Sequence, residues 1–492
     1  MKHPVIDPEK DYYGVLEIPI DADEERIKRA YRQQARRHHP DSGSGDVAAF
    51  RLVQEAYDIL RDTVLRQAYD RQRTARGLTE QGPLQWTFTL SRLHLEALDS
   101  PQLLYVLIDI RASKEKEPQA SRLPLNLALV IDRSNSMRGV RMENVKLAAL
   151  DMLEYLAPQD RLAVVAFSDR AEVFAPSTLA TDRATLRSAI TALTPGGGTE
   201  INQGLLKGLD EIRNHHSPNH ISHIFLLTDG RTYGDEEKVL DVAEEAYTQG
   251  IGISALGIGE DWNDLLLDEA ARRGGGFCKY IESPSQVRQI LRDHIHGLSD
   301  VVAQDLSLSV QLADDSRIQS FHRIMPHMEH LGAHTARPYL LGPLQAEKGL
   351  SLLMELIVKQ AEPGWKRVAR FDLSSKLLKT AQPLQLHRDV ELRFVRELDE
   401  QPQVSSRLLN YLSRLSIFRL QERAWLALEA GETNQATSLL QAAATRLFDM
   451  GYRDLAQAAM LEAGRVSQGG PPTMLGRKKL RYGTRSLTLP TK

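Results

Sequence analysis

Apolar and polar positions near the start of the chain follow a helical period. Apolar or small side chains recur every three or four positions in two segments, residues 24–38 and 46–60. The first stripe contains Ile27, Ala30, Tyr31 and Ala35, and the second contains Phe50, Val53, Tyr57 and Leu60. Pro40 lies between the two segments, and the residue before a proline disfavours the α conformation. The pattern predicts two antiparallel helices in an all-α hairpin, part of a domain spanning residues 1–75.

A different pattern occupies residues 121–298, where continuous apolar runs alternate with amphipathic segments. The apolar runs, expected to be strands, are residues 125–132, 161–168, 221–228 and 251–258. The expected helices are residues 144–156, 182–193, 201–214, 236–249, 264–273 and 283–298. Apolar strands between amphipathic helices are typical of a parallel sheet covered on both faces. This part is therefore predicted to be a doubly wound, Rossmann-like α/β domain.

Segments rich in β-formers stand on both sides of this unit. Two precede it, residues 84–95 and 103–110. Six follow it: residues 303–312, 318–321, 336–341, 349–358, 365–372 and 384–394. Their alternation predicts strands. By analogy with other multidomain folds, we expect residues 80–120 and 299–400 to form one β-sandwich into which the α/β domain is inserted.

The last ninety residues change character twice. Residues 405–430, 433–450 and 455–465 are rich in Ala and Leu with helical spacing, so 401–467 is predicted to be an antiparallel helical hairpin or small bundle. Residues 468–492 begin with Gly469-Gly470-Pro471-Pro472 and carry basic but no acidic side chains. This composition predicts a disordered basic tail, either a solvated appendage or a docking peptide. Thr484, Ser486 and Thr488 are candidate kinase targets within it.

Composition narrows the class of protein. The 492 residues carry a formal net charge of -3, which gives no electrostatic case for binding nucleic acid or a membrane surface. The single cysteine, Cys278, excludes an intrachain disulfide and suits a reducing compartment. No apolar run reaches the length of a membrane span. We expect a multidomain cytoplasmic protein.

The N-terminal hairpin carries a cationic face and a distinctive tripeptide. The basic side chains of its first helix are Arg26, Lys28, Arg29, Arg32 and Arg36. The tripeptide His39-Pro40-Asp41 follows them, between an upstream Asp11-Tyr12-Tyr13 and a downstream Ala68-Tyr69-Asp70. In this order the segments resemble a J-domain (DnaJ-like). The resemblance implies that an Hsp70 (DnaK-like) chaperone docks on the basic helix and the tripeptide and hydrolyses ATP faster. The alternative is a degenerate J-like hairpin whose basic face is only solvated.

Oxygen-bearing side chains gather at expected strand ends of the α/β domain. Asp132, Ser134 and Ser136 follow the first strand, Asp229 follows the third, and Thr199 follows a glycine triplet. Ligands in such sheets bind at the carboxyl ends of the strands. Hydroxyls and carboxylates without His or Cys suit a hard cation such as Mg²⁺ or Mn²⁺. Because these oxygens are too few for a closed cage, water or a partner's carboxylate must complete the coordination.

The same residues resemble the metal-ion-dependent adhesion site of a von Willebrand factor A (VWA) domain. Asp132-Arg133-Ser134-Asn135-Ser136 matches its DxSxS loop, with Asn135 where many relatives have glycine. The resemblance implies that the two serines and Thr199 contact the metal, while Asp132 and Asp229 act directly or through water. The alternative is that these oxygens only cap turns and helices. Four histidines, His215, His216, His220 and His223, are expected in an exposed loop, with a zinc site the less favoured interpretation.

Together these features predict a non-enzymatic Hsp70 co-chaperone. The J-domain would deliver Hsp70 to an unknown protein partner, which the VWA domain binds through Mg²⁺ and an acidic residue of that partner. A second hypothesis is a signalling or assembly scaffold that works with an AAA-type ATPase or kinase, where the J-like unit only binds protein. A Mg²⁺-dependent hydrolase is a third class. It is disfavoured because no His, Lys or second carboxylate cluster accompanies the oxygens in the sequence.

Overall fold

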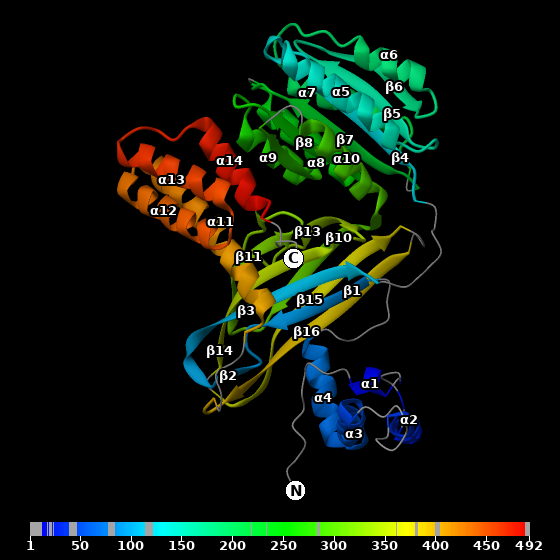
Figure 1. Cartoon of the computed structure of the whole chain (residues 1–492), viewed down its shortest axis with the longest axis vertical. Helices are drawn as coiled ribbons and strands as arrows, with labels where there is room; N and C mark the ends of the chain where they lie inside the picture. The colour runs from blue at the N-terminus through cyan, green and yellow to red at the C-terminus, as the bar shows by residue number, and fades with distance from the viewer. Residues whose placement is uncertain are drawn as a thin grey trace.

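The computed structural model describes residues 12–16, 18, 22, 24–38, 47–76, 84–113, 122–217, 219–232, 234–282, 286–360, 362–378, 382–398 and 404–487. The tripeptide His39-Pro40-Asp41 lies outside the described residues. Figure 1 shows a small helical domain at one end, paired sheets in the middle, and an α/β domain at the other end with a helical domain beside it.

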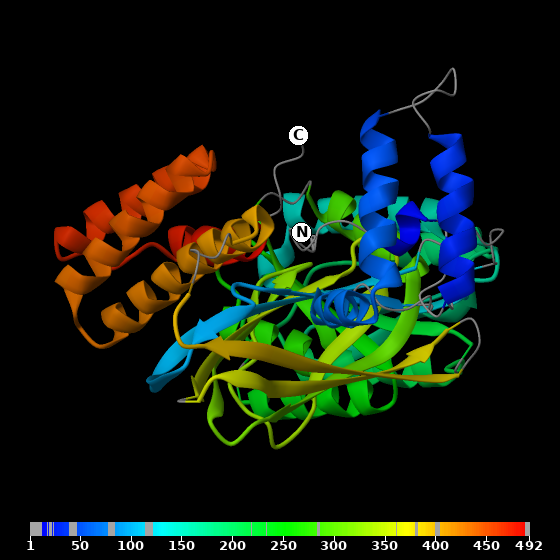
Figure 2. The same cartoon turned by 90° about the horizontal axis from the view of Figure 1, so that it is seen from below.

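The N-terminal domain contains helices α1 (Tyr12–Val15), α2 (Glu24–Arg37), α3 (Val47–Arg61) and α4 (Thr63–Arg76). Helices α2 and α3 lie side by side, which confirms the predicted hairpin (Figure 2). Tyr31 of α2 stacks on Tyr57 of α3 with ring centroids 4.0 Å apart. The amide of Tyr12 donates to the hydroxyl of Tyr69 at 2.9 Å, so α1 is tied to α4. These contacts give the domain its own core.

The α/β domain is built on a six-stranded sheet of order β6-β5-β4-β7-β8-β9. Its strands are β4 (Leu125–Asp132), β5 (Arg161–Phe167), β6 (Ala171–Leu179), β7 (Ile221–Thr228), β8 (Ile251–Ile258) and β9 (Gly275–Ile281). The helices are α5 (Val140–Tyr155), α6 (Arg183–Thr191), α7 (Ile201–Arg213), α8 (Glu236–Thr248), α9 (Asp264–Arg273) and α10 (Gln286–Ser299). Helices α5, α6 and α10 cover one face, and α7, α8 and α9 cover the other.

The two edge strands of this sheet, β6 and β9, were not predicted. Strand β6 runs antiparallel to β5, whereas the other neighbouring strands are parallel. Both edge strands are partly exposed along most of their length, so neither has the continuous apolar run of a central strand. The expectation of an all-parallel sheet therefore holds for the interior of the sheet and fails at the β6 edge.

Two five-stranded sheets occupy the middle of the molecule, with orders β1-β3-β14-β11-β12 and β13-β10-β15-β16-β2. The strands before the α/β domain are β1 (Leu84–Leu90), β2 (His94–Glu96) and β3 (Leu98–Ala112). Those after it are β10 (Val301–Leu312), β11 (Ser316–Met325), β12 (Glu329–His330), β13 (Tyr339–Gln345), β14 (Leu350–Gln360), β15 (Gly364–Leu377) and β16 (Pro383–Val395). Strand β3 pairs with β14, and Phe88 packs edge-on against Phe371 at 5.2 Å. One apolar core thus joins strands from both sides of the α/β domain.

The C-terminal domain contains α11 (Ser406–Glu429), α12 (Thr433–Asp449), α13 (Arg453–Ser467) and α14 (Met474–Arg485), the first three as predicted. Helix α11 is fastened to the central sheets by ion pairs. Arg407 reaches Asp109 at 2.7 Å, and Arg419 reaches Glu355 at 2.7 Å. Both carboxylates are buried. None of the helices that the structure describes is long and apolar enough to span a bilayer.

The prediction of a disordered basic tail is wrong for residues 474–485, which form α14. Arg481 pairs with Asp264 at 2.8 Å, and Arg485 pairs with Asp268 at 2.9 Å. The Nζ atom of Lys478 donates to the backbone oxygens of Glu260 and Trp262 at 2.5 and 2.9 Å. The acidic and carbonyl partners lie about two hundred positions upstream, so local composition could not reveal them. Helix α14 therefore fastens the C-terminal domain to the α/β domain.

Burial changes the interpretation of one candidate kinase target in the tail, Thr484, whereas Ser486 is exposed. Thr484 is 0% exposed and donates to Oε1 of Gln421 at 2.9 Å, so a kinase cannot reach it in this fold. Thr488 lies outside the described residues.

We predict that Leu480→Ala destabilises the chain by about 2–5 kcal/mol, because Leu480 is 1% exposed and its truncation leaves a cavity. Thermal unfolding followed by circular dichroism measures the effect, and amide hydrogen exchange locates it in α14. The control is Lys479→Ala, whose partner Glu282 is exposed and which should change stability by about 0.5 kcal/mol or less. Equal, negligible effects of the two substitutions would mean that α14 does not pack as described.

Candidate functional site

The oxygen-bearing residues singled out from the sequence meet at the carboxyl edge of the α/β sheet. Asp132 ends β4, and a 3₁₀ turn over Asn135–Met137 follows it. The hydroxyls of Ser134 and Ser136 are 2.9 Å apart, and that of Ser136 donates to Oδ1 of Asp229 at 2.7 Å. Parallel strands bring their carboxyl ends to one edge, which is why residues almost a hundred positions apart become neighbours.

Thr199 closes the same cluster from the loop before α7. A methyl group built on Gly230 would lie 3.0 Å from Oγ1 of Thr199 and 3.5 Å from Oδ2 of Asp132. The glycine therefore lets the backbone after β7 approach both side chains closely. All the predicted site residues of this domain are brought together at one edge of the sheet.

Both carboxylates of the cluster are completely buried. Asp132 accepts hydrogen bonds from the amide of Ser134 at 2.8 Å and from the hydroxyl of Thr228 at 2.6 Å. Burial nevertheless raises the pKa of Asp132 to about 6, because loss of water disfavours the charged form more than these bonds favour it. The two carboxylates thus lie where little water is present to screen a charge on them.

Two residues of the site were missed by sequence reasoning. Thr228 precedes Asp229 directly, and its position in Thr228-Asp229-Gly230 was a local signal that could have identified it. Arg141 forms an ion pair with Oδ2 of Asp229. Nothing in the local sequence indicates this pair, because the two residues meet only through the packing of α5 beside β7.

The donor chemistry of the cluster fits a hard divalent cation. Its members offer three hydroxyl and two carboxylate side chains, the ligand types that Mg²⁺ and Mn²⁺ prefer. Among the described residues there is no cluster of three or more His, Cys, Asp or Glu side chains that could hold a metal ion.

The expectation of an exposed histidine loop is wrong for His223. His223 lies on β7, is 4% exposed, and contacts Oγ of Ser254 at 2.9 Å and Nε2 of His294 at 3.3 Å. Burial lowers the pKa of His223 to about 3, so the ring is neutral at physiological pH. The sequence prediction missed this because all positions of central strand β7 are buried. His215 and His216 are exposed as expected.

The five basic side chains of the predicted Hsp70-binding surface lie on α2. Arg26, Lys28, Arg29, Arg32 and Arg36 are exposed, whereas Ile27 of the same helix is buried in the core. The basic stripe therefore faces solvent along the whole helix. The tripeptide that completes the predicted surface falls outside the described residues.

Comparison with protein-family models assigns three parts of the chain. Residues 11–70 match the DnaJ domain, residues 126–293 match the von Willebrand factor type A domain, and residues 406–490 match the Sll0103-like, C-terminal alpha-helical domain. The last match includes α14, in agreement with its ordered packing.

Individual relatives match different shares of the chain. An uncharacterized protein, sll0103, from Synechocystis is 29% identical over 77% of this chain and 92% of its own length. Chaperone protein DnaJ 1 from Streptomyces avermitilis is 51% identical over 72 residues, which are 14% of this chain and 18% of that protein. The likeness to the chaperone is thus limited to the N-terminal domain, and the chain spans less than a fifth of it.

Solved structures resemble the larger part of the fold. A von Willebrand factor type A protein from Catenulispora acidiphila aligns over 82% of this chain and 97% of its own, with a TM-score of 0.66 at 18% identity. The ArnB paralog VWA2 from Sulfolobus acidocaldarius aligns over 82% and 100%, with a TM-score of 0.53 at 13% identity. By the family models, the chain joins an N-terminal DnaJ domain to a von Willebrand factor type A domain and a C-terminal helical domain, and the solved structures agree with the fold of the larger part.

Proposed function

We propose that this chain is a J-domain co-chaperone that recruits an Hsp70 and stimulates its ATPase at partners bound through a Mg²⁺-dependent VWA domain. One observation carries the proposal: a DnaJ domain and a convergent cluster of hydroxyl and carboxylate oxygens, with both carboxylates buried, belong to the same chain. The first would determine which chaperone is recruited, and the second would determine where it is delivered. An Hsp70 partner of the DnaK type would place the chain in the cytoplasm.

The proposed binding of Hsp70 is supported by the positive charge of α2 and by the similarity of the N-terminal domain to J-domains. The stripe on α2 presents five exposed cations on one helix, a surface suited to an acidic partner. Complementary charge speeds encounter and fixes the register of two docking proteins. By resemblance to J-domains, His39 and Asp41 would then bias the bound Hsp70 toward hydrolysis, and this chain would supply no ATPase chemistry itself.

The metal side rests on the donor set around Asp132 and Asp229. Ser134, Ser136 and Thr199 would offer hydroxyl oxygens, and the two carboxylates would balance the charge of the ion. When bound, the ion would supply a positive centre that an acidic partner residue can ligate. The buried walls of this edge keep the carboxylates dry, which strengthens their attraction for a cation.

The arrangement of domains suits an adaptor. Figure 1 places the DnaJ domain and the VWA domain at opposite ends, with the two sheets between them. We interpret these sheets as one β-sandwich interrupted by the inserted VWA domain, an interpretation supported by their shared core. Such a spacer would let Hsp70 and a partner bind without colliding.

We assign no catalysis to the oxygen cluster. Its members bond to one another and to Arg141, and no His or Lys among the described residues forms a hydrogen bond with them. A general base would need such contact or a bridging water. The scaffold hypothesis loses the support of a free basic tail, because Lys478, Arg481 and Arg485 are engaged within the chain.

We predict that the full-length chain raises the steady-state ATPase rate of a DnaK-type Hsp70, measured by phosphate release. His39→Gln should abolish the increase, because the tripeptide is the element that the resemblance assigns to stimulation. Ser134→Ala/Ser136→Ala, which leaves the DnaJ domain intact, is the matched control and should stimulate like wild type. Equal stimulation by wild type and His39→Gln contradicts the proposal. Capture of an AAA-type ATPase or kinase from lysate without Hsp70 would instead support the scaffold hypothesis.

Burial of Asp132 predicts that the stability of the folded chain depends on pH. Its pKa is raised from 3.8 to about 6, so between these pH values the folded chain holds a proton that the unfolded chain has released. Stability therefore falls as pH rises through this interval, by up to about 3 kcal/mol at about 1.4 kcal/mol per unit. In EDTA, Asp132→Asn should raise the thermal midpoint at pH 7.5 and leave it nearly unchanged at pH 4.

The control for this experiment is Ser136→Ala, because the hydroxyl of Ser136 bonds to Ser134 and Asp229 and not to Asp132, so the pH dependence of the wild type should be kept. A gain for Asp132→Asn that is the same at both pH values would show that burial of the charge is not the cause.

A further inference from the structure

Arg141, near the start of α5, contacts Asp229 of the proposed metal site. Its guanidinium pairs with Oδ2 of Asp229, and its Nη1 also donates to the backbone oxygen of Ser136 at 3.4 Å. The side chain is 33% exposed, whereas that of Asp229 is fully buried. Arg141 therefore reaches inward from the rim to a carboxylate that no other described cation contacts.

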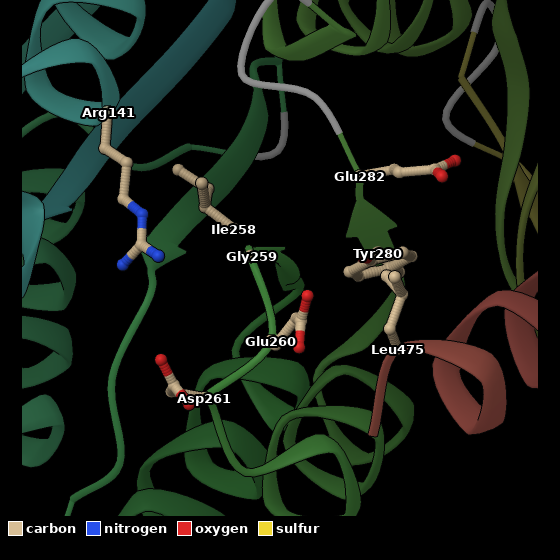
Figure 3. Close-up of a pocket in the computed structure, with 8 residues that line it drawn as sticks. All are labelled: Arg141, Ile258, Gly259, Glu260, Asp261, Tyr280, Glu282 and Leu475. Carbon is tan, nitrogen blue, oxygen red and sulfur yellow. The ribbon is translucent and has the colours of Figure 1, made fainter. Parts of the chain in front are cut away.

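The backbone around the guanidinium of Arg141 leaves room for this side chain. Gly259 follows β8 with φ +74°, and a methyl group there would lie 3.2 Å from Nη2 of Arg141. Positive φ favours glycine, and the missing side chain leaves room for the guanidinium beside the backbone. Figure 3 shows the Arg141 side chain extending from α5 toward Gly259. Three elements thus converge on one arginine: α5, the end of β7 and the end of β8.

This contact conflicts with a metal ion at the same place. Both oxygens of Asp229 are engaged, Oδ1 by the hydroxyl of Ser136 and Oδ2 by Arg141. A divalent cation that uses Asp229, directly or through water, competes with Arg141 for the negative charge of this carboxylate. A guanidinium and a divalent ion on one buried carboxylate also repel each other strongly, because little water separates them.

A second resting place for the guanidinium lies next to the site. A cavity of about 340 Å³ is lined by Arg141 together with the acidic residues Glu260, Asp261 and Glu282. Within the described part of the chain, Glu260 and Asp261 make no ion pair, whereas Glu282 pairs with Lys479. Figure 3 shows the carboxylates of Glu260 and Asp261 across the cavity from Arg141. The cavity offers the displaced cation both space and opposite charge.

We propose that Arg141 is a built-in competitor of the metal, which neutralises Asp229 in the free chain and moves toward Glu260 and Asp261 when a divalent cation binds. The inference rests on the proposed metal site. It implies that the free chain binds metal weakly. An acidic partner residue, by adding negative charge at the same edge, makes metal and partner bind cooperatively.

The test is a titration of the full-length chain with Mn²⁺, with the free ion measured by electron paramagnetic resonance. Arg141→Gln should lower the dissociation constant for Mn²⁺ tenfold or more. Arg141→Lys, which keeps the charge, should stay within about threefold of wild type. The matched control is Arg138→Gln, because Arg138 is exposed on the neighbouring loop and forms no ion pair within the described residues. Its loss should change the affinity less than threefold.

A second comparison tests the resting place. Glu260→Gln/Asp261→Asn should weaken Mn²⁺ binding in the wild-type background and have little effect in the Arg141→Gln background, because the arginine that needs those carboxylates is gone. Equal weakening in both backgrounds would show that the acids act on the ion directly and would overturn the displacement.

The outcomes separate the inference from the proposed function. Tight Mn²⁺ binding that is equal in wild type and Arg141→Gln overturns the role of Arg141 and leaves the metal site standing. Weaker binding with a lowered thermal midpoint in Arg141→Gln shows a structural arginine and also overturns that role. Absence of Mn²⁺ binding from every variant contradicts the metal site itself, and the inference with it.

Discussion

Asp132 and Asp229 are fully buried at one edge of the α/β sheet, where a negative charge is costly unless a positive charge compensates it. This constraint explains the contacts of the candidate site. Burial raises the pKa of Asp132, so its carboxyl group loses the proton less readily. Asp229 forms an ion pair with Arg141. Both carboxylates are 0% exposed, so solvent compensates little of their charge. Such a site is suited to bind a cation. The hydroxyls of Ser134, Ser136 and Thr199 surround the place where one would be held.

Charge pairs between distant segments also hold the domains together. Asp268 of the VWA domain pairs with Arg481 and Arg485 of α14, while Asp109 of the central sheets pairs with Arg407 of α11. These pairs are partly buried, and removing one partner would leave the other charge uncompensated, so they favour this arrangement of the domains. The C-terminal domain is thereby fixed against both the VWA domain and the central sheets.

What could be predicted from the sequence depended on whether the signal was local. The hairpin of α2 and α3 follows from apolar spacing, and the central strands β4, β5, β7 and β8 follow from continuous apolar runs. The convergence of Asp132 with Asp229 follows from the rule that parallel strands end at one edge. Edge strands β6 and β9, the order of α14 and the pairing of Arg141 depend on contacts with remote segments. No window of sequence contains those contacts.

Calorimetric titration of Mg²⁺ into the full-length chain tests the central claim most directly, since a DnaJ domain becomes a targeted adaptor only if the VWA edge binds metal. The account predicts one Mg²⁺ per chain for wild type and none for Ser134→Ala/Ser136→Ala, with thermal stability of the variant retained in EDTA. Identical titrations of the two proteins, or no binding by wild type even at millimolar Mg²⁺, would contradict it.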